Sequence, residues 1–92
     1  MRGLEVHLNG RKLCTAGIGP DAVLNTIVDV VGRKDELTED DYHMMLRVGG
    51  LENDEFLIWA RSKLRVGDEI RIRIVADEPF DAPSERKMIH EV

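Results

Sequence analysis

The stretch that decides the fold class is Leu64-Arg65-Val66-Gly67-Asp68-Glu69-Ile70-Arg71-Ile72-Arg73-Ile74-Val75. From Ile70 onwards, isoleucine alternates strictly with arginine. Successive side chains of a β-strand point to opposite faces, so this alternation predicts a strand with an apolar inner face and a charged outer face. The Gly67-Asp68 pair just before it indicates a turn. We expect this strand to lie at the centre of a sheet that the rest of the chain completes.

A hairpin is predicted near the N-terminus, where Asn9-Gly10 separates two alternating runs. Both residues readily take the positive φ angles that a type I′ turn requires. With these two residues as the loop, Val6 opposes Leu13 and Glu5 opposes Cys14. The inner face then carries Leu4, Val6, Leu8 and Leu13, and the outer face carries Glu5, His7, Lys12 and Cys14.

Further strands are expected at 42–50 and 55–60, where apolar side chains again alternate. In the second of these, Phe56 and Ile58 lie on one side and Leu57 and Trp59 on the other, so both faces are apolar. Short strands separated by turn signals are typical of all-β domains. We therefore predict a mainly β fold, a small antiparallel barrel or sandwich of about five to six strands.

The segment 22–31 fits two interpretations. It is rich in valine and isoleucine, which are stiff at χ1 and favour a pleated surface. Its apolar residues also fit one face of a helix, with Asp21 as N-cap and Gly32 just past the end. We favour a strand, and the alternative is an α+β fold with a helix at 22–31.

The domain organisation follows from a change of composition after residue 76. We expect residues 1–76 to form a single β domain and residues 77–92 to form an acidic, proline-containing tail. Ser84 is placed to cap a short helix in this tail, and a loose tail is the alternative. The segment 33–41 is a polar loop, in which Thr38 is placed to cap one helical turn.

Composition limits the partners and the compartment. Eighteen acidic residues against 13 basic ones give a formal net charge of −5, which argues against a nucleic-acid partner. No apolar run approaches the roughly 20 residues that span a bilayer, and the charged start of the chain is unlike a secretory signal. The single cysteine, Cys14, forms no internal disulfide. We expect a cytoplasmic protein without membrane association.

One candidate metal site lies on the predicted outer face of the first hairpin. There His7, Cys14 and Glu5 would be neighbours, and imidazole, thiolate and carboxylate all bind zinc. The same trio would serve as an activated nucleophile, with His7 as the base for Cys14. No paired metal-ligand spacing supports either hypothesis, so we favour a solvated His7 and a Cys14 that fills space. We therefore expect no cofactor and no enzymatic activity.

Arg47, Arg71 and Arg73 are the candidate binding residues. If their strands are neighbours, the three guanidinium groups form a basic stripe on an acidic protein. Arginine offers a planar, two-pronged array of donors, so the stripe would receive an acidic peptide or a phosphate. The alternative is that these charges only keep the outer face soluble.

Three segments together resemble a set of small, uncharacterised bacterial proteins. They are Leu64-x-Val66-Gly67-Asp68-Glu69-Ile70, Val48-Gly49-Gly50-Leu51 and Leu4-x-Val6-x-Leu8-Asn9-Gly10. The resemblance covers most of the chain up to about Pro83. It implies a bacterial, cytoplasmic, mainly β domain, and it brings no activity and no functional residue.

Two classes of function remain. The first is a non-catalytic protein–protein interaction module, which suits a compact domain that lacks a catalytic constellation. An open edge strand in such a module also permits homodimerisation by strand addition. The second is a small-molecule or metal-binding β domain.

Overall fold

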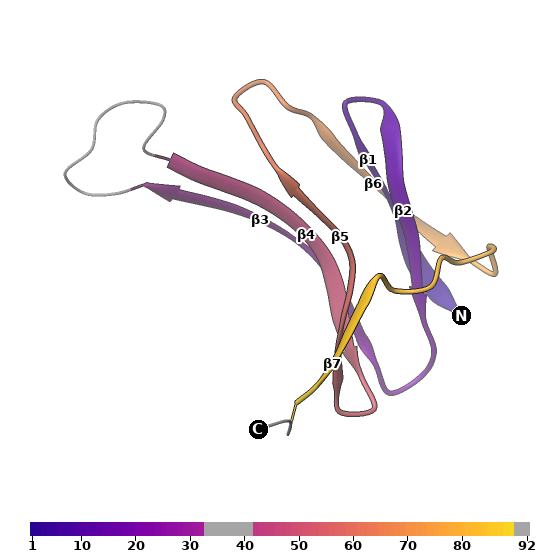
Figure 1. Ribbon diagram of the computed structural model, residues 1–92. Coiled ribbons are helices and arrows are strands. Elements are labelled where there is room, and N and C mark those ends of the chain that lie inside the picture. Colours follow the sequence, from indigo (N-terminus) through magenta and orange to yellow (C-terminus); the bar gives the residue numbers. More distant parts are fainter. Residues whose placement is uncertain (33–41, 90–92) are drawn as a thin grey trace.

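Seven β-strands make up the secondary structure of the computed structural model, which describes residues 1–32 and 42–89 (Figure 1). They are β1 (Arg2–Leu8), β2 (Arg11–Ile18), β3 (Val23–Gly32), β4 (Tyr42–Glu52), β5 (Glu55–Lys63), β6 (Ile70–Ala76) and β7 (Glu85–Met88). All paired strands are antiparallel. The predicted mainly β fold is confirmed, and the segment 22–31 forms a strand rather than the alternative helix.

The strands form two sheets. Of the two predicted architectures, barrel and sandwich, the structure is a sandwich. A three-stranded sheet has the order β2-β1-β6, and a four-stranded sheet has the order β3-β4-β5-β7. The core between them is small and consists of buried side chains from both sheets: Val6, Cys14, Ala16, Leu46, Val48, Leu57 and Trp59. Within the described ranges, no helix is long and apolar enough to cross a membrane.

The strand that carries the alternating isoleucines is not central, and this prediction was wrong. β6 pairs only with β1 among the described strands, so β1 is the centre of its sheet and β6 is an edge. The isoleucines of β6 do lie on the same face of the sheet as Val6, whose side chain is fully buried. Their own burial decreases from Ile70 to Ile74. Ile72 is 46% exposed and Ile74 is 80% exposed, because the four-stranded sheet does not extend over them.

A bulge changes the predicted register of the first hairpin. The Asn9-Gly10 turn forms as expected, with φ angles of 52° and 81°, and Leu8 opposes Arg11. The register then shifts between Val6 and His7, so that Cys14 opposes Val6. An extra residue in one strand of a ladder moves all later side chains to the other face. Cys14 therefore lies in the core and not on the outer face.

The tail contains a strand where a short helix was expected. Glu85–Met88 pairs with Glu55–Ile58 as β7, and the Ser84 N–H donates to the carbonyl of Ile58 at 2.8 Å. Figure 1 shows the segment 77–84 crossing from the end of β6 to the four-stranded sheet. We call this segment the strap. Its Phe80 ring occupies the space that side chains would need at the paired residues Gly3 and Gly17.

Asp81 ties the strap to both sheets. Its carboxylate accepts the Thr15 N–H at 2.8 Å, and its own N–H donates to the Thr15 carbonyl at 2.8 Å. Its carbonyl accepts the indole N–H of Trp59 at 2.8 Å. Thr15 belongs to β2 and Trp59 to β5, so one residue joins the two layers of the sandwich.

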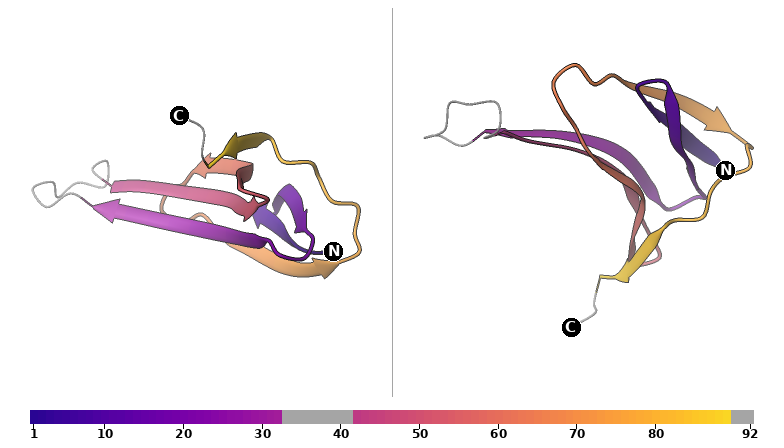
Figure 2. Two further views of the ribbon diagram at one scale, coloured as in Figure 1. Left: turned by 90° about the horizontal axis from the view of Figure 1, so that it is seen from below. Right: turned by 45° about the horizontal axis from the view of Figure 1, so that its top comes forward.

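The β3–β4 hairpin extends past the rest of its sheet as a curved arm (Figures 1 and 2). Val30 on this arm is 64% exposed and Val31 is 53% exposed, because neither lies over the core. The loop 33–41 that joins the two strands, with the helical turn expected at Thr38, lies outside the described residues.

Replacing Asp81 with alanine removes the acceptor of the Thr15 N–H while leaving the two main-chain hydrogen bonds of residue 81 in place. We expect the free energy of unfolding to fall by about 1.5–3 kcal/mol, the usual contribution of a hydrogen bond to a charged group. Urea unfolding followed by the fluorescence of Trp59 measures this change. Glu78→Ala is the control, because Glu78 is an exposed carboxylate of the strap that lies 3.9 Å from Arg73. An equal loss in both variants would contradict the role given to Asp81.

Candidate functional site

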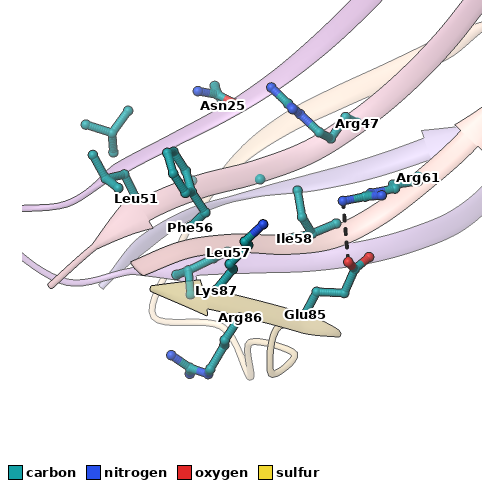
Figure 3. A pocket seen from close by; sticks show the side chains of 13 residues that line it. Asn25, Arg47, Leu51, Phe56, Leu57, Ile58, Arg61, Glu85, Arg86 and Lys87 are labelled. Atoms are coloured by element: carbon teal, nitrogen blue, oxygen red, sulfur yellow. Dashed lines mark ion pairs between the residues drawn. The ribbon is translucent and has the colours of Figure 1, made fainter. Parts of the chain in front are cut away.

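A groove lies on the outer face of the four-stranded sheet, opposite the core (Figure 3). Leu57 and Trp59 face the core, so the residues that alternate with them, Phe56 and Ile58, face outward. The groove has a volume of about 730 Å³ and is crossed by β3, β4, β5 and β7. Its floor is apolar and consists of Val23, Leu51, Phe56 and Ile58. Phe56 is 52% exposed, an unusual position for a phenylalanine in a folded domain.

The groove is hollow because Gly49 has no side chain. Gly49 opposes Ile58, and the register of β4 and β5 shifts between Val48 and Gly49. A Cβ atom at residue 49 would lie 2.7 Å from the carbonyl oxygen of Leu57 and 3.1 Å from the Cδ1 atom of Ile58. Any other residue would therefore clash with the backbone of β5 and fill the space above Ile58.

Cationic side chains surround this floor. Arg47 on β4 is directly opposite Arg61 on β5, and Lys87 on β7 is opposite Phe56. Arg61 lies 3.4 Å from Glu85, which is the ion pair drawn in Figure 3. Arg86 lies 3.7 Å from Glu55. Between residues 1–32 and 42–89, no ion pair engages Arg47 or Lys87.

The Arg47–Arg61 pair is unfavourable by itself. Like charges directly opposite each other on one face of a sheet destabilise the pairing. Glu85 neutralises Arg61, but the positive charge of Arg47 remains beside an apolar hollow. A bound anion would relieve this repulsion, and arginine binds carboxylates and phosphates through two parallel hydrogen bonds. The groove is thus suited to a ligand that has both an anionic and an apolar part.

The predicted basic stripe does not form, because its strands belong to different sheets. Arg47 is on β4, whereas Arg71 and Arg73 are on β6 of the three-stranded sheet. Arg71 is opposite His7 and Arg73 is opposite Glu5. Arg73 also lies 3.9 Å from Glu78. Of the three predicted residues, Arg47 alone lines the groove.

The predicted trio of Glu5, His7 and Cys14 is also separated. The bulge places Cys14 in the core, while Glu5 and His7 remain half-buried on the other face of the sheet. Nε2 of His7 lies 3.0 Å from Oε1 of Glu5, and this hydrogen bond lowers the pKa of Glu5, assisted by the nearby Arg73. The described residues hold no group of three histidine, cysteine or carboxylate side chains placed to bind a metal ion.

Cys14 is also poorly suited to act as a nucleophile. Its burial among apolar side chains raises the pKa of the thiol to about 11, with the Asp81 carboxylate contributing in the same direction. A thiol needs to be ionised to react, and reactive cysteines have a lowered pKa. The geometry thus favours the interpretation of Cys14 as a core residue that fills space.

Part of the groove had a visible signal in the sequence. The apolar residues on both faces of 55–60 indicated an unusual strand, and Phe56 and Ile58 now form the floor of the groove. The wall formed by Glu85, Arg86 and Lys87 was missed because the tail was expected to be a helix or loose. The three consecutive charged residues of β7 show no alternation that would predict a strand.

Comparison of this chain with protein-family models, with curated proteins and with solved structures gives no match. The resemblance to small bacterial proteins therefore stays a prediction.

The raised pKa of Cys14 makes stability depend on pH in a defined window. Burial raises the pKa of this thiol from 9.0 to about 11, so between these values the unfolded chain releases a proton that the folded chain keeps. Ionisation of the thiol then stabilises the unfolded state alone, so the free energy of unfolding falls as the pH rises from about 9 to about 11.

Urea unfolding of the wild type and of Cys14→Ala, repeated across this range, measures the effect. The variant should show a shallower decrease with pH, because it lacks the thiol. Identical slopes in the two proteins would contradict the burial of an un-ionised Cys14.

Proposed function

We propose that this protein is a non-catalytic interaction module, which binds an acidic, apolar segment of a partner protein in the groove of the four-stranded sheet. The observation that carries the proposal is the position of Arg47. This guanidinium is held opposite Arg61 at the border of an apolar hollow. An acidic side chain of the partner would contact Arg47 and Lys87, and a neighbouring apolar side chain would cover Phe56 and Ile58.

The shape of the groove supports an extended partner segment. The groove runs across four strands, from Val23 on β3 to Lys87 on β7, and it is partly open to solvent. Figure 3 shows the side chains along it. Apolar side chains provide contact area, and the charges around them select the sign of the partner. The chain itself is acidic, with a net charge of −5, so this local basic region contrasts with the rest of the surface.

The second candidate function is the binding of a small anionic molecule in the same groove. The specific observation in its favour is the volume of about 730 Å³, which lies in the usual range for small-molecule sites. The same residues would serve both functions.

The proposed location is the cytoplasm of a bacterium. The support for it is the resemblance of three sequence segments to small bacterial proteins and the single, buried and unpaired cysteine. A reducing compartment keeps such a thiol free.

Selection of a random phage-displayed peptide library against the purified protein tests the proposed function. We expect the selected peptides to place aspartate or glutamate beside phenylalanine, leucine or isoleucine. Titration calorimetry with a selected synthetic peptide then gives the dissociation constant for the wild type and for Arg47→Glu. Loss of one charge-assisted hydrogen bond should weaken binding by about tenfold to a hundredfold.

Arg11→Glu is the matched control, because it makes the same change of charge at an exposed arginine of the other sheet, which forms no ion pair with a described residue. The control should bind like the wild type, and circular dichroism should show that both variants are folded at the temperature of the titration. An equal loss in both would mean that net charge, and not the groove, decides binding. If no peptide is selected while carboxylate-bearing fragments shift the NMR signals of Phe56 and Ile58, the small-molecule function replaces the proposal.

A further inference from the structure

β3 is an edge strand that carries little of the usual protection against pairing with another strand. It is ten residues long and pairs with β4 without a register shift. Its sequence contains no lysine, arginine or proline, and Asp29 is its one charged residue. Among the described strands, β4 is its sole partner. Natural proteins normally break such edges with charges, prolines or bulges.

The three other sheet edges are protected. β2 contains a bulge and begins with Arg11 and Lys12, and Asp81 of the strap occupies the N–H and carbonyl of its Thr15. β6 carries Arg71 and Arg73, and β7 is only four residues long. The open edge of β3 is therefore specific to this strand. Figure 2 shows β3 running along one side of the extended hairpin.

Except at Thr26 and Val28, which are both β-branched but differ in polarity, the sequence of β3 is symmetric in residue class about Ile27. In Val23-Leu24-Asn25-Thr26-Ile27-Val28-Asp29-Val30-Val31, each residue before Ile27 has a counterpart at the same distance after it. Val23 corresponds to Val31 and Leu24 to Val30, while the polar Asn25 corresponds to the polar Asp29. A strand that is symmetric in this way is complementary to an antiparallel copy of itself.

We propose that the edge of β3 is a homodimer interface, in which β3 of a second copy pairs antiparallel about Ile27. In this register Ile27 opposes Ile27 of the second copy, Val23 opposes Val31, and Leu24 opposes Val30. The Asn25 amide opposes the Asp29 carboxylate twice in each dimer and donates a hydrogen bond to it. The two four-stranded sheets join into one continuous sheet, as in other cases of strand addition.

Neighbouring registers are less favourable for a physical reason. Residues that oppose each other across a ladder share one face of the sheet, so the register changes only in steps that keep this parity. One such step places Asp29 opposite Ile27 and Asn25 opposite Val31, so that polar groups lie against apolar ones. The next step places Asp29 opposite Asp29, and like charges directly opposite each other are destabilising. The register about Ile27 is the one that pairs Asn25 with Asp29 and leaves Thr26 opposite the β-branched Val28.

Disulfide trapping tests the register directly. Ile27→Cys, made together with Cys14→Ala, should give a disulfide-linked dimer under mild oxidation, because directly opposed Cα atoms lie about 4.5–5.5 Å apart, within the span of a disulfide. Val31→Cys in the same background is the matched control on the same face of the strand. In the proposed register the two copies of residue 31 lie about 27 Å apart, at about 3.4 Å per residue, and should cross-link at less than a tenth of the rate.

Sedimentation equilibrium tests the interface with the native cysteine retained. The wild type should dimerise reversibly under reducing conditions. Asn25→Asp places like charges opposite each other twice in each dimer and should raise the dissociation constant of the dimer about tenfold. Asn25→Lys should lower this constant, because it gives two opposite-charge pairs with Asp29.

Asn53→Asp in the β4–β5 turn is the control for the change of charge, and it should leave the dissociation constant as in the wild type. A wild type that stays monomeric at every concentration would overturn the proposal. So would cross-linking through residue 31 that equals cross-linking through residue 27, or a dimer that neither substitution of Asn25 affects. None of these measurements uses a groove ligand, so their outcome is separate from that of the proposed function.

Discussion

The hydrogen bonds of Asp81 are the constraint on which the rest of the structure depends. A chain of 92 residues buries a small core, and in the described residues the cluster between the sheets has seven buried side chains. The contact between the two sheets is correspondingly limited. Asp81 adds a polar connection, because it bonds to Thr15 of one sheet and to Trp59 of the other. The same contacts fix the path of the strap. They thereby place β7 beside β5, where β7 pairs with it and forms one wall of the groove.

Local patterns in the sequence were sufficient to predict where most strands lie, but they did not predict the register between β1 and β2. The alternation of residues and the Asn9-Gly10 turn predicted the fold class, six of the seven strands and the first hairpin. They did not reveal the bulge, because Leu13 and Cys14 are both small enough and apolar enough to face the core in succession. A single extra residue then moved Cys14 to the opposite face from the predicted one. The predicted trio of Glu5, His7 and Cys14 therefore does not form.

The remaining errors concern contacts between segments that are distant in the sequence. Alternation shows which side chains share a face, but it does not show which strands are neighbours. For this reason β6 was placed at the centre of a sheet, and Arg47 was grouped with Arg71 and Arg73. The strap is a similar case. Phe80 lies against Gly3 and Gly17, which oppose each other on paired strands. Nothing in the sequence indicates that these two glycines are neighbours or that Phe80 packs on them.

The two proposals meet on β3, where Asn25 lines the groove and also pairs with Asp29 of the second copy. Strand addition uses mainly the backbone groups at the free edge of β3, so Arg47, Phe56 and Ile58 of the groove stay accessible. Joining two copies at this edge would place both grooves on one face of a continuous sheet. A partner with two acidic segments would then gain affinity from the second groove, since its second contact becomes intramolecular. The unprotected edge and the cationic groove would thus act together in the proposed dimer.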